Sequence, residues 1–380
     1  MRIFYDHTVF QFQRYGGISR YFYELITRLS MQEDVSISLF QGFNVNEYAL
    51  ADKKQNFAFY WGHKWKYKKP AAKYMALLFA IPNKILCDKH MFLSDVDIYH
   101  PTYYRNGLKK KKKTAIVITV YDMIHELYPD QFIDSWFVIK AKKRAISIAD
   151  VIITISENTK NDLIKIYNVP ESKIKVVYLA SSLRSSSPTT IDELKEVYGL
   201  KRPYILYVGD RRTYKNFKCL INSYIDNFSD EFDLICFGGG KLKKEELKNI
   251  NSSISNNIIQ LSGSDDLLAS LYKHAFCFVY PSLYEGFGIP PLEAMSMGCP
   301  VIASNVSSIP EVVGNAAILF DPHSNDELIN AIRSLYDESK RKDLIKSGFE
   351  QEKKFSWDKM AKETLEVYKA IIKNRCDGRW

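Results

Sequence analysis

The sequence of 380 residues has no uninterrupted apolar run near the roughly 18 to 20 residues needed to cross a lipid bilayer. The longest candidate is residues 74–82. The first ten residues include Asp6 and His7 and have no apolar core of a secretion signal. These absences argue against a membrane-spanning or secreted protein, and we predict a cytoplasmic one.

Cysteine pairs with the spacing of a metal site or redox centre are also missing, because the sequence contains no C-x-x-C. The six cysteines are scattered, at positions 87, 219, 236, 277, 299 and 376. Internal repeats at solenoid spacing are absent too. We therefore expect reduced thiols, no metal site and no repeat architecture.

The sequence does contain enough apolar residues for two packed cores. Hydrophobic residues make up 46% of a chain that is longer than one core usually serves, so two domains are expected. The first half begins with a strand at 2–5, a helix opened by Gly16 and Gly17, and a strand at 35–40. Further strands are expected at 97–100, 114–121, 151–155 and 175–179. This alternation predicts a mostly parallel, doubly wound α/β sheet over 1–182.

The second half repeats this alternation after a serine-rich stretch, which predicts a linker at 183–199. Helices, including 265–273 and 326–338, fit between the expected strands. These strands are at 204–208, 232–237, 258–261, 275–280, 301–303 and 317–320. They predict a second doubly wound domain over 200–356. A helix and tail at 357–380 follow, and the sequence does not indicate which domain this helix packs against.

The stretch Y-E-G-F-G-I-P-P-L-E-A-M-S-M-G-C-P, residues 284–300, places Glu285 and Glu293 on either side of a turn of glycines and prolines. Proline suits a first helical turn, so we predict Glu293 in the first turn of a short helix and Glu285 in the loop before it. At the carboxyl edge of a parallel sheet, such a site can hold a phosphate on helix N–H groups and sugar hydroxyls on carboxylates. The alternative is that Glu293 only favours the helix dipole and Glu285 is solvated.

The longer segment P-S-L-Y-E-G-F-G-I-P-P-L-E-A-M-S-M-G-C-P-V-I-A-S resembles the E-x7-E signature of retaining glycosyltransferases of family 4. Four other segments match that family in order: Y-G-G-I-S-R-Y, I-S-E-N-T-K-N-D-L, Y-V-G-D-R-R-T-Y-K-N-F and S-S-I-P-E-V-V-G-N-A-A-I-L-F-D-P. The resemblance is weakest at about 41–95 and in the last thirty residues. It implies the GT-B fold, two Rossmann-like doubly wound parallel-sheet domains facing a central cleft. The N-terminal domain would bind the acceptor and the C-terminal domain the nucleotide sugar.

The resemblance also implies roles for the donor site. Glu293 would bind the ribose hydroxyls of a nucleotide-sugar donor, and Glu285 would contact the transferred sugar. Lys215 would neutralise the donor diphosphate together with an arginine, for which Arg211 and Arg212 compete and Arg211 is slightly favoured. The other donor-binding positions would be backbone groups at Gly16, Gly17, Gly209, Gly286, Phe287 and Gly288.

One departure from the family concerns the end of the strand at 114–121. Many relatives have a histidine followed by an acid there, whereas this sequence has Tyr121 and Asp122, with His125 three residues later. Tyr121, Asp122 and His125 are all candidates for a side chain near the anomeric carbon. For His125, an ordinary loop histidine is an equal alternative.

The resemblance implies a metal-independent hexosyltransferase that works by front-face transfer with retention, with the leaving phosphate helping to deprotonate the acceptor. GDP-mannose is the first donor expected, and a UDP-sugar is the alternative. A catalytically inactive sugar-nucleotide-binding protein is a less favoured reading. The expected acceptor is a saccharide or lipid-linked saccharide in cell-surface polysaccharide synthesis, such as lipopolysaccharide. Residues 238–240, three glycines, could line the nucleotide, although G-x-G-x-x-G is incomplete because position 243 is lysine.

The net charge of +9 is concentrated in one segment. Residues 61–115 carry twelve lysines and one arginine against three aspartates, a local charge of +10. Aromatic residues alternate with lysines over 61–74, a pattern that fits an anionic membrane surface. We predict a peripheral position on the inner face of the membrane through this segment. A solvated basic face is the alternative, and nucleic-acid binding, suggested by the lysine run 109–113 alone, is not expected.

Overall fold

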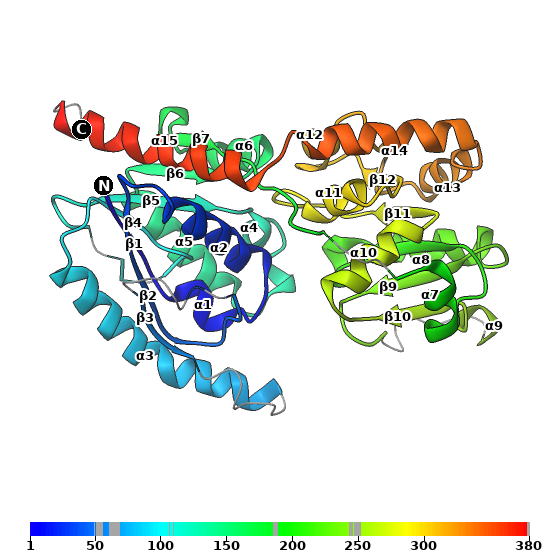
Figure 1. Cartoon of the computed structure of the whole chain (residues 1–380), viewed down its shortest axis with the longest axis horizontal. Helices are drawn as coiled ribbons and strands as arrows, with labels where there is room; N and C mark the ends of the chain where they lie inside the picture. The colour runs from blue at the N-terminus through cyan, green and yellow to red at the C-terminus, as the bar shows by residue number, and fades with distance from the viewer. Residues whose placement is uncertain are drawn as a thin grey trace. The chain divides into compact units, whose positions relative to one another are not determined.

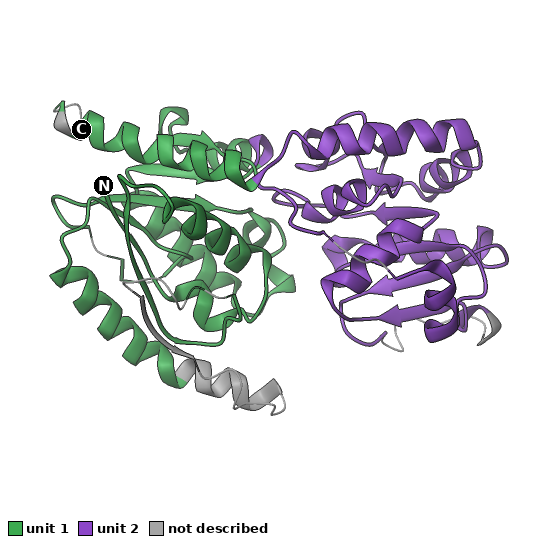
Figure 2. Cartoon of the chain, viewed as in Figure 1, with its two compact units in different colours: residues 1–155, 159–178, 357–380 green, residues 156–158, 179–356 purple. Residues whose placement is uncertain are grey.

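The computed structural model describes residues 1–48, 50, 56–60, 69–105, 107–108, 110–184, 189–242, 246 and 252–377. The chain divides into two compact units (Figure 2). Unit 1 comprises residues 1–155, 159–178 and 357–380, and unit 2 comprises residues 156–158 and 179–356. The stretch 183–199, where the sequence suggested a linker, falls in unit 2. It contains helix α7, Ile191–Tyr198, and a capping box between Thr190 and Glu193 stabilises the N-terminus of this helix.

Unit 1 is built on a seven-stranded parallel sheet with the order β3-β2-β1-β4-β5-β6-β7 (Figure 1). The strands are β1 Arg2–Tyr5, β2 Ser36–Asn44, β3 Asn56–Tyr60, β4 Ile98–His100, β5 Ala115–Val120, β6 Val151–Thr154 and β7 Ile174–Val176. Every residue of β4, β5 and β6 is buried, as expected for strands covered on both faces. The strands predicted for this half are all present, and β3 is an additional edge strand beside β2.

The helices of unit 1 are α1 Thr8–Phe12, α2 Gly17–Leu29, α3 Lys69–Leu93, α4 Ile124–Leu127, α5 Ser135–Ile148, α6 Glu157–Tyr167 and α15 Trp357–Cys376, although the first two residues of α6 are grouped with unit 2. Helix α15 packs along α2 (Figure 1). The hydroxyl of Tyr368 lies 2.5 Å from Nδ1 of His100 and 3.1 Å from the hydroxyl of Tyr5. The C-terminal helix therefore belongs to the first unit, which answers the question that the sequence left open.

Unit 2 is built on a six-stranded parallel sheet with the order β10-β9-β8-β11-β12-β13. The strands are β8 Tyr204–Val208, β9 Asp233–Phe237, β10 Ile258–Leu261, β11 Cys277–Tyr280, β12 Val301–Ser304 and β13 Ile318–Phe320. The main helices are α8 Phe217–Asn227, α10 Asp265–His274, α11 Ile289–Ser296, α12 Ile309–Val313, α13 Asn325–Ser334 and α14 Glu338–Glu352. The single helix predicted at 326–338 ends earlier, because Asp337 caps the N-terminus of a new helix, α14.

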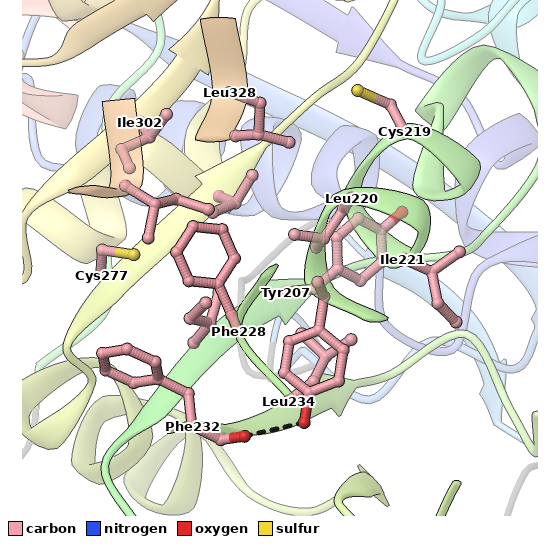
Figure 3. Close-up of a cluster of buried hydrophobic side chains, with 14 of the residues drawn as sticks. Tyr207, Cys219, Leu220, Ile221, Phe228, Phe232, Leu234, Cys277, Ile302 and Leu328 are labelled. Atoms are coloured by element: carbon pink, nitrogen blue, oxygen red, sulfur yellow. Dashed lines mark hydrogen bonds between the residues drawn. The ribbon is translucent and has the colours of Figure 1, made fainter. Parts of the chain in front are cut away.

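The core of unit 2 fills the space between the sheet and its covering helices (Figure 3). Aromatic side chains dominate its lower part, where Phe228 and Phe232 pack edge to face with ring centroids 6.4 Å apart. Tyr224 is fully buried and donates its hydroxyl to the carbonyl oxygen of Phe232, at 2.8 Å. Buried tyrosines of this kind satisfy their polar end within the core, so the sheet is a rigid base for the loops at its carboxyl edge.

Candidate functional site

The two glutamates both follow β11, one of the two central strands of the unit 2 sheet. Helix α11 begins at Ile289, because Gly288 takes a left-handed conformation (φ +102°) at the N-cap and the two prolines that follow need no N–H partner. Glu293 is therefore the fifth helical residue and lies outside the first turn, which corrects the prediction. Its carboxylate accepts a hydrogen bond from the hydroxyl of Tyr272 at 3.4 Å.

Lys215 and Glu285 form a largely buried ion pair. Nζ of Lys215 lies 2.7 Å from Oε1 of Glu285, and the side chains are 18% and 12% exposed. The ammonium group also lies 5.7 Å from the ring centroid of Tyr280. Burial alone would lower the pKa of Lys215, but the charge and hydrogen bond of Glu285 outweigh it, so the pKa is raised. A fixed positive charge is thus present at the carboxyl ends of β8 and β11.

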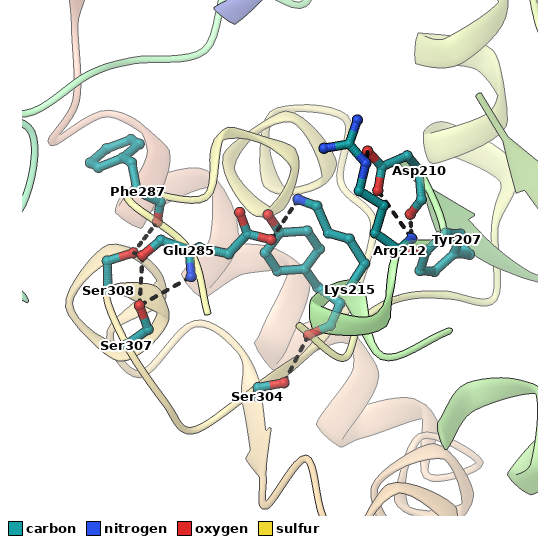
Figure 4. Close-up of polar contacts among 10 residues, drawn as sticks. Tyr207, Asp210, Arg212, Lys215, Glu285, Phe287, Ser304, Ser307 and Ser308 are labelled. Carbon is teal, nitrogen blue, oxygen red and sulfur yellow. Dashed lines mark hydrogen bonds and ion pairs between the residues drawn. The ribbon is translucent and has the colours of Figure 1, made fainter. Parts of the chain in front are cut away.

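Two serines from the loop after β12 hold the backbone at Glu285 (Figure 4). The hydroxyl of Ser307 accepts from the N–H of Glu285 at 3.1 Å and donates to its carbonyl oxygen at 2.6 Å. The hydroxyl of Ser308 lies 2.9 Å from the carbonyl oxygens of Glu285 and Phe287. Ser307 adopts φ +59°, which is unusual for a residue with a Cβ. The loop that carries Glu285 is therefore fixed from a segment 22 residues further along the chain.

The two candidate arginines differ in their environments. The side chain of Arg211 is 3% exposed, and its Nε donates to Glu246 at 2.7 Å. Its other nitrogens donate to the carbonyl oxygens of residues 238–241 at 2.9–3.4 Å. Arg212 is 51% exposed and lies 3.3 Å from Asp210. Arg211 thus bonds the loop after β9, whereas Arg212 is half exposed and lies beside Asp210 (Figure 4).

The glycine loop at residues 238–240 needs glycine at all three positions, because each has a positive φ, between +68° and +82°. A Cβ at Gly239 would lie 2.6 Å from the carbonyl oxygen of Gly209 and 2.7 Å from the guanidinium of Arg211. Gly209, another predicted donor-binding position, also has a left-handed φ of +130°. The carboxyl ends of β8 and β9 therefore meet in close backbone contact, which a side chain at Gly239 would prevent.

In unit 1, Gly16 and Gly17 lie at the start of α2, as predicted for a glycine turn. A Cβ at Gly16 would lie 2.5 Å from Oε1 of Gln13, which accepts a hydrogen bond from the N–H of Ser19. A Cβ at Gly17 would have no neighbouring atom within 4 Å. A side chain at Gly16 would therefore displace the Gln13 amide from its bond to Ser19, whereas Gly17 borders open space.

The three candidates after β5 lie in different settings. The hydroxyl of Tyr121 is buried and donates to the carbonyl oxygen of Thr102 at 3.4 Å. Asp122 is half-buried and accepts from the N–H of Ile124 at 3.0 Å. Nδ1 of His125 is buried and has no hydrogen-bond partner in the described part of the chain. Burial lowers the pKa of His125, so its imidazole is predominantly neutral near pH 7.

A buried ion pair that the sequence did not indicate supports this segment. Nζ of Lys142, from α5, donates to Oε2 of Glu126 and to the carbonyl oxygen of Asp122, both at 2.8 Å. The other carboxylate oxygen of Glu126 accepts from the hydroxyl of Tyr167 at 2.7 Å. Lys142 is fully buried. Neither this pair nor the serines at 307 and 308 could be found from local patterns, because their partners lie 16 to 23 residues away.

Two doubly wound parallel sheets in one chain, with a charged site after the central strands of the second, are typical of GT-B glycosyltransferases. Two family models match this chain. Residues 15–180 match Glycosyltransferase Family 4, and residues 190–351 match Glycosyl transferases group 1. The chain belongs to glycosyltransferase family 4, and it is a glycosyltransferase.

Curated relatives point in the same direction. The O-antigen chain mannosyltransferase B of Escherichia coli is 28% identical over 93% of this chain and 96% of its own length. The O-antigen chain mannosyltransferase RfbU of Salmonella typhimurium strain LT2 is 32% identical over 57% of this chain and 60% of its own length. These matches place the chain among transferases of polysaccharide synthesis.

Solved structures confirm the fold. The sucrose-phosphate synthase of Thermosynechococcus elongatus has a TM-score of 0.73 at 18% identity and covers 97% of this chain and 98% of its own. The HepE protein of Anabaena, in complex with UDP-glucose, has a TM-score of 0.65 at 17% identity. This match covers 97% of the present chain and 99% of the HepE chain. Both chains match over almost their whole length, so the likeness includes both units.

Proposed function

We propose that the protein transfers mannose from GDP-mannose to a saccharide or lipid-linked saccharide, with retention of configuration and without a metal ion. The mannosyltransferase relatives support the choice of sugar. The ion pair between Lys215 and Glu285, at 2.7 Å, is the observation that carries the proposal. The pair lies after adjacent strands, β8 and β11, and Glu285 is the carboxylate that would contact the sugar.

The reaction needs positive charge on the leaving diphosphate. The bond between the sugar C1 and the phosphate oxygen breaks, a bond from C1 to the acceptor oxygen forms on the same face, and the acceptor proton passes to the leaving phosphate oxygen. Lys215 supplies a charge that Glu285 holds in place before the donor arrives, so little reorganisation is needed during the reaction. Glu285 can then accept a hydrogen bond from a hydroxyl of the bound sugar.

We assign the second diphosphate cation to Arg212. Arg211 uses its donors on Glu246 and on four carbonyl oxygens, whereas half of the Arg212 side chain is exposed. A guanidinium binds phosphate oxygens through paired N–H groups, and two cations can stabilise the diphosphate without a metal. Arg211 would instead shape the glycine loop that would line the nucleotide.

Titration calorimetry with GDP and UDP tests the choice of donor. We expect GDP to bind at least about tenfold more tightly, which corresponds to roughly 1.4 kcal/mol. Tighter binding of UDP would favour a UDP-sugar as the donor. Incubation with GDP-mannose and no acceptor should release mannose slowly. Tight binding with no turnover under any acceptor would indicate an inactive sugar-nucleotide-binding protein.

The site residues are tested by Glu293→Ala and Lys215→Met. We expect Glu293→Ala to weaken nucleoside diphosphate binding about tenfold with little change in kcat, because it removes hydrogen bonds present in both ground and transition states. Lys215→Met should lower kcat about 100-fold or more, because it removes charge stabilisation of the leaving group. Wild-type kinetics in both variants would contradict the assignment.

Retention and metal independence need separate measurements. The anomeric proton of the product, followed by NMR as it forms, should show the same configuration as the donor. Activity should persist after dialysis against EDTA and should not rise when Mg²⁺ or Mn²⁺ is added back. An inverted product, or activity restored only by a divalent ion, would refute that part of the proposal.

A further inference from the structure

Helix α3 of unit 1 is apolar on two opposite faces. Its inner face contains the buried Cys87 and Met91 and packs against β2. Its outer face carries six large apolar side chains that are 38–73% exposed: Leu78, Ile81, Ile85, Leu86, Phe92 and Leu93. A surface helix of a water-soluble domain normally has polar residues on its outer face. We call these six residues the α3 apolar face.

The spacing shows that these side chains form one continuous strip. Leu78, Ile81, Ile85 and Phe92 are three, four and seven residues apart, the intervals at which residues share one side of a helix. Leu86 and Leu93 each follow one of them and widen the strip. Scattered exposed apolar residues need no explanation, but a contiguous strip on one helix indicates a surface that contacts something apolar.

The charges around the strip are positive. Lys89 lies within it, between Ile85 and Phe92, and Lys84 borders it; both are exposed. Nζ of Lys111 lies 5.2 Å from the ring centroid of Phe92 and caps the helix by donating to the carbonyl oxygens of residues 91 and 92, at 2.8 and 2.6 Å. Lys111, from the lysine run, is thus in part structural.

Two acids near the strip have ion-pair partners of their own. Asp88 is paired with Arg105, and Asp95 is paired with Arg2. The strip therefore consists of exposed apolar side chains with lysines within it and at its edge. Such a surface is complementary to an apolar layer bordered by negative charge. An anionic phospholipid bilayer has that structure, with acyl chains below a layer of phosphates.

We propose that α3 docks the protein on an anionic bilayer, with the α3 apolar face in the interface and Lys84 and Lys89 at the lipid phosphates. The helix would lie along the surface: no helix in the described ranges is long and apolar enough to cross a membrane. The aromatic and lysine pattern of residues 61–68 lies outside the described residues, as do the side chains of 69–77, so this proposal rests on residues 78–93 alone. It goes beyond the transfer reaction and does not depend on the choice of donor.

Vesicle co-sedimentation tests this proposal with the full-length protein and no sugar substrates. Vesicles of phosphatidylcholine with about 30% phosphatidylglycerol are compared with vesicles of pure phosphatidylcholine at physiological salt. We expect binding to the anionic vesicles and weaker binding as salt rises, because exposed charges are screened. Absence of binding to the anionic vesicles would overturn the proposal.

Two variants and a matched control separate the contributions. Ile81→Ser with Ile85→Ser should reduce partitioning at least about tenfold, through loss of buried apolar area. Lys84→Glu with Lys89→Glu should reduce it about 25-fold or more, at about fivefold per lysine. The control, Val197→Ser with Lys342→Glu, changes an exposed valine and an exposed lysine of unit 2 and should bind as the wild type does.

Three results would count against the proposal. Equal binding by the wild type and both α3 variants would show that another surface binds the membrane. Equal loss in the control would show that overall charge, not α3, governs binding. A wild-type dimer in analytical ultracentrifugation that the serine variant converts to a monomer would make this face a contact between two copies. Because every substituted side chain is exposed, unchanged circular dichroism is expected for all variants and would exclude unfolding as the cause.

Discussion

At the scale of single residues, Ser307 combines a strained backbone with two hydrogen bonds to the backbone of Glu285. A non-glycine residue with φ +59° costs on the order of 1 kcal/mol, and glycine would avoid that cost. The hydroxyl, however, holds both the N–H and the carbonyl oxygen of Glu285. We infer that serine is used because the hydroxyl fixes the loop whose N–H groups are proposed to hold the sugar.

This inference predicts the same loss of activity for two substitutions at Ser307, although only glycine would relieve the backbone strain. Ser307→Ala and Ser307→Gly should each lower kcat about tenfold, because each removes both hydrogen bonds to the backbone of Glu285, of roughly 0.5–1.5 kcal/mol each. Binding of the nucleoside diphosphate, measured by calorimetry, should stay within about twofold of the wild type. Ser296→Ala, which removes a hydroxyl bonded within α11, is the control and should leave kcat unchanged. Wild-type kcat in Ser307→Gly would show that only backbone conformation matters there.

Arg211 and Arg212 should separate stability from catalysis. Arg211→Ala removes a buried side chain that bonds Glu246 and the carbonyl oxygens of residues 238–241, so we expect a loss of about 2–4 kcal/mol in the free energy of unfolding. Arg212→Ala should leave the melting temperature unchanged and lower kcat/KM about 10- to 100-fold, because its guanidinium is proposed to bind the diphosphate. Calorimetric melting and steady-state kinetics measure the two effects. A stable, inactive Arg211→Ala would return the diphosphate role to Arg211.

At the scale of secondary-structure elements, the buried pair Lys142–Glu126 fixes the segment after β5 to α5. The pair has side-chain exposures of 1% and 7%, so its desolvation is nearly complete. Lys142 also donates to the carbonyl oxygen of Asp122, one of the three candidates after β5. Removing one partner of such a pair is more damaging than removing both, because one buried charge is then unpaired.

We therefore predict that Lys142→Met lowers the free energy of unfolding by about 3–5 kcal/mol. The double variant Lys142→Met with Glu126→Gln should recover a large part of that loss, because no unpaired charge remains. Urea denaturation measures both, and the double-mutant cycle gives the coupling between the two residues. If the double variant is as unstable as the sum of the single ones, the two side chains act independently and the segment is held by something else.

The strands could be predicted because each is a short apolar run, and burial on both faces of a parallel sheet imposes that pattern. The start of α11 was harder to predict from the sequence. Its position depends on Gly288 taking a left-handed conformation, which moved Glu293 out of the first turn. Strand β3 was missed because it is an edge strand in the stretch where family resemblance is weakest. Ser307, Ser308 and Lys142 were missed because their roles depend on contacts between distant parts of the chain.

At the scale of the whole molecule, histidines with lowered pKa values are concentrated in unit 1. Burial lowers the pKa of His7 to about 4 and that of His100 to about 3, from an ordinary value of 6.5. His90 and His125, also in unit 1, have pKa values lowered by burial as well. Each of these side chains binds a proton more weakly in the folded protein than in the unfolded chain. Acidification below pH 6.5 therefore favours unfolding of unit 1.

The expected effect is large between pH 7 and pH 5. Each of His7 and His100 should remove about 2 kcal/mol of stability from unit 1 at pH 5, because that pH lies roughly 1.5 units below the unfolded-state value. Tryptophan fluorescence can follow unit 1 selectively. All five tryptophans belong to unit 1, at positions 61, 65, 136, 357 and 380. Circular dichroism reports both units together.

We predict that the urea midpoint followed by fluorescence falls markedly between pH 7 and pH 5. The circular dichroism curve should then show a first transition that coincides with the fluorescence change and a second, less shifted one from unit 2. His100→Gln is the matched variant, because glutamine keeps a polar group beside Tyr368 and Thr119 but does not titrate near neutral pH. Its fluorescence midpoint should depend less steeply on pH than that of the wild type. Equal pH dependence in both proteins, or a single transition at all pH values, would show that buried histidines do not set the acid stability of unit 1.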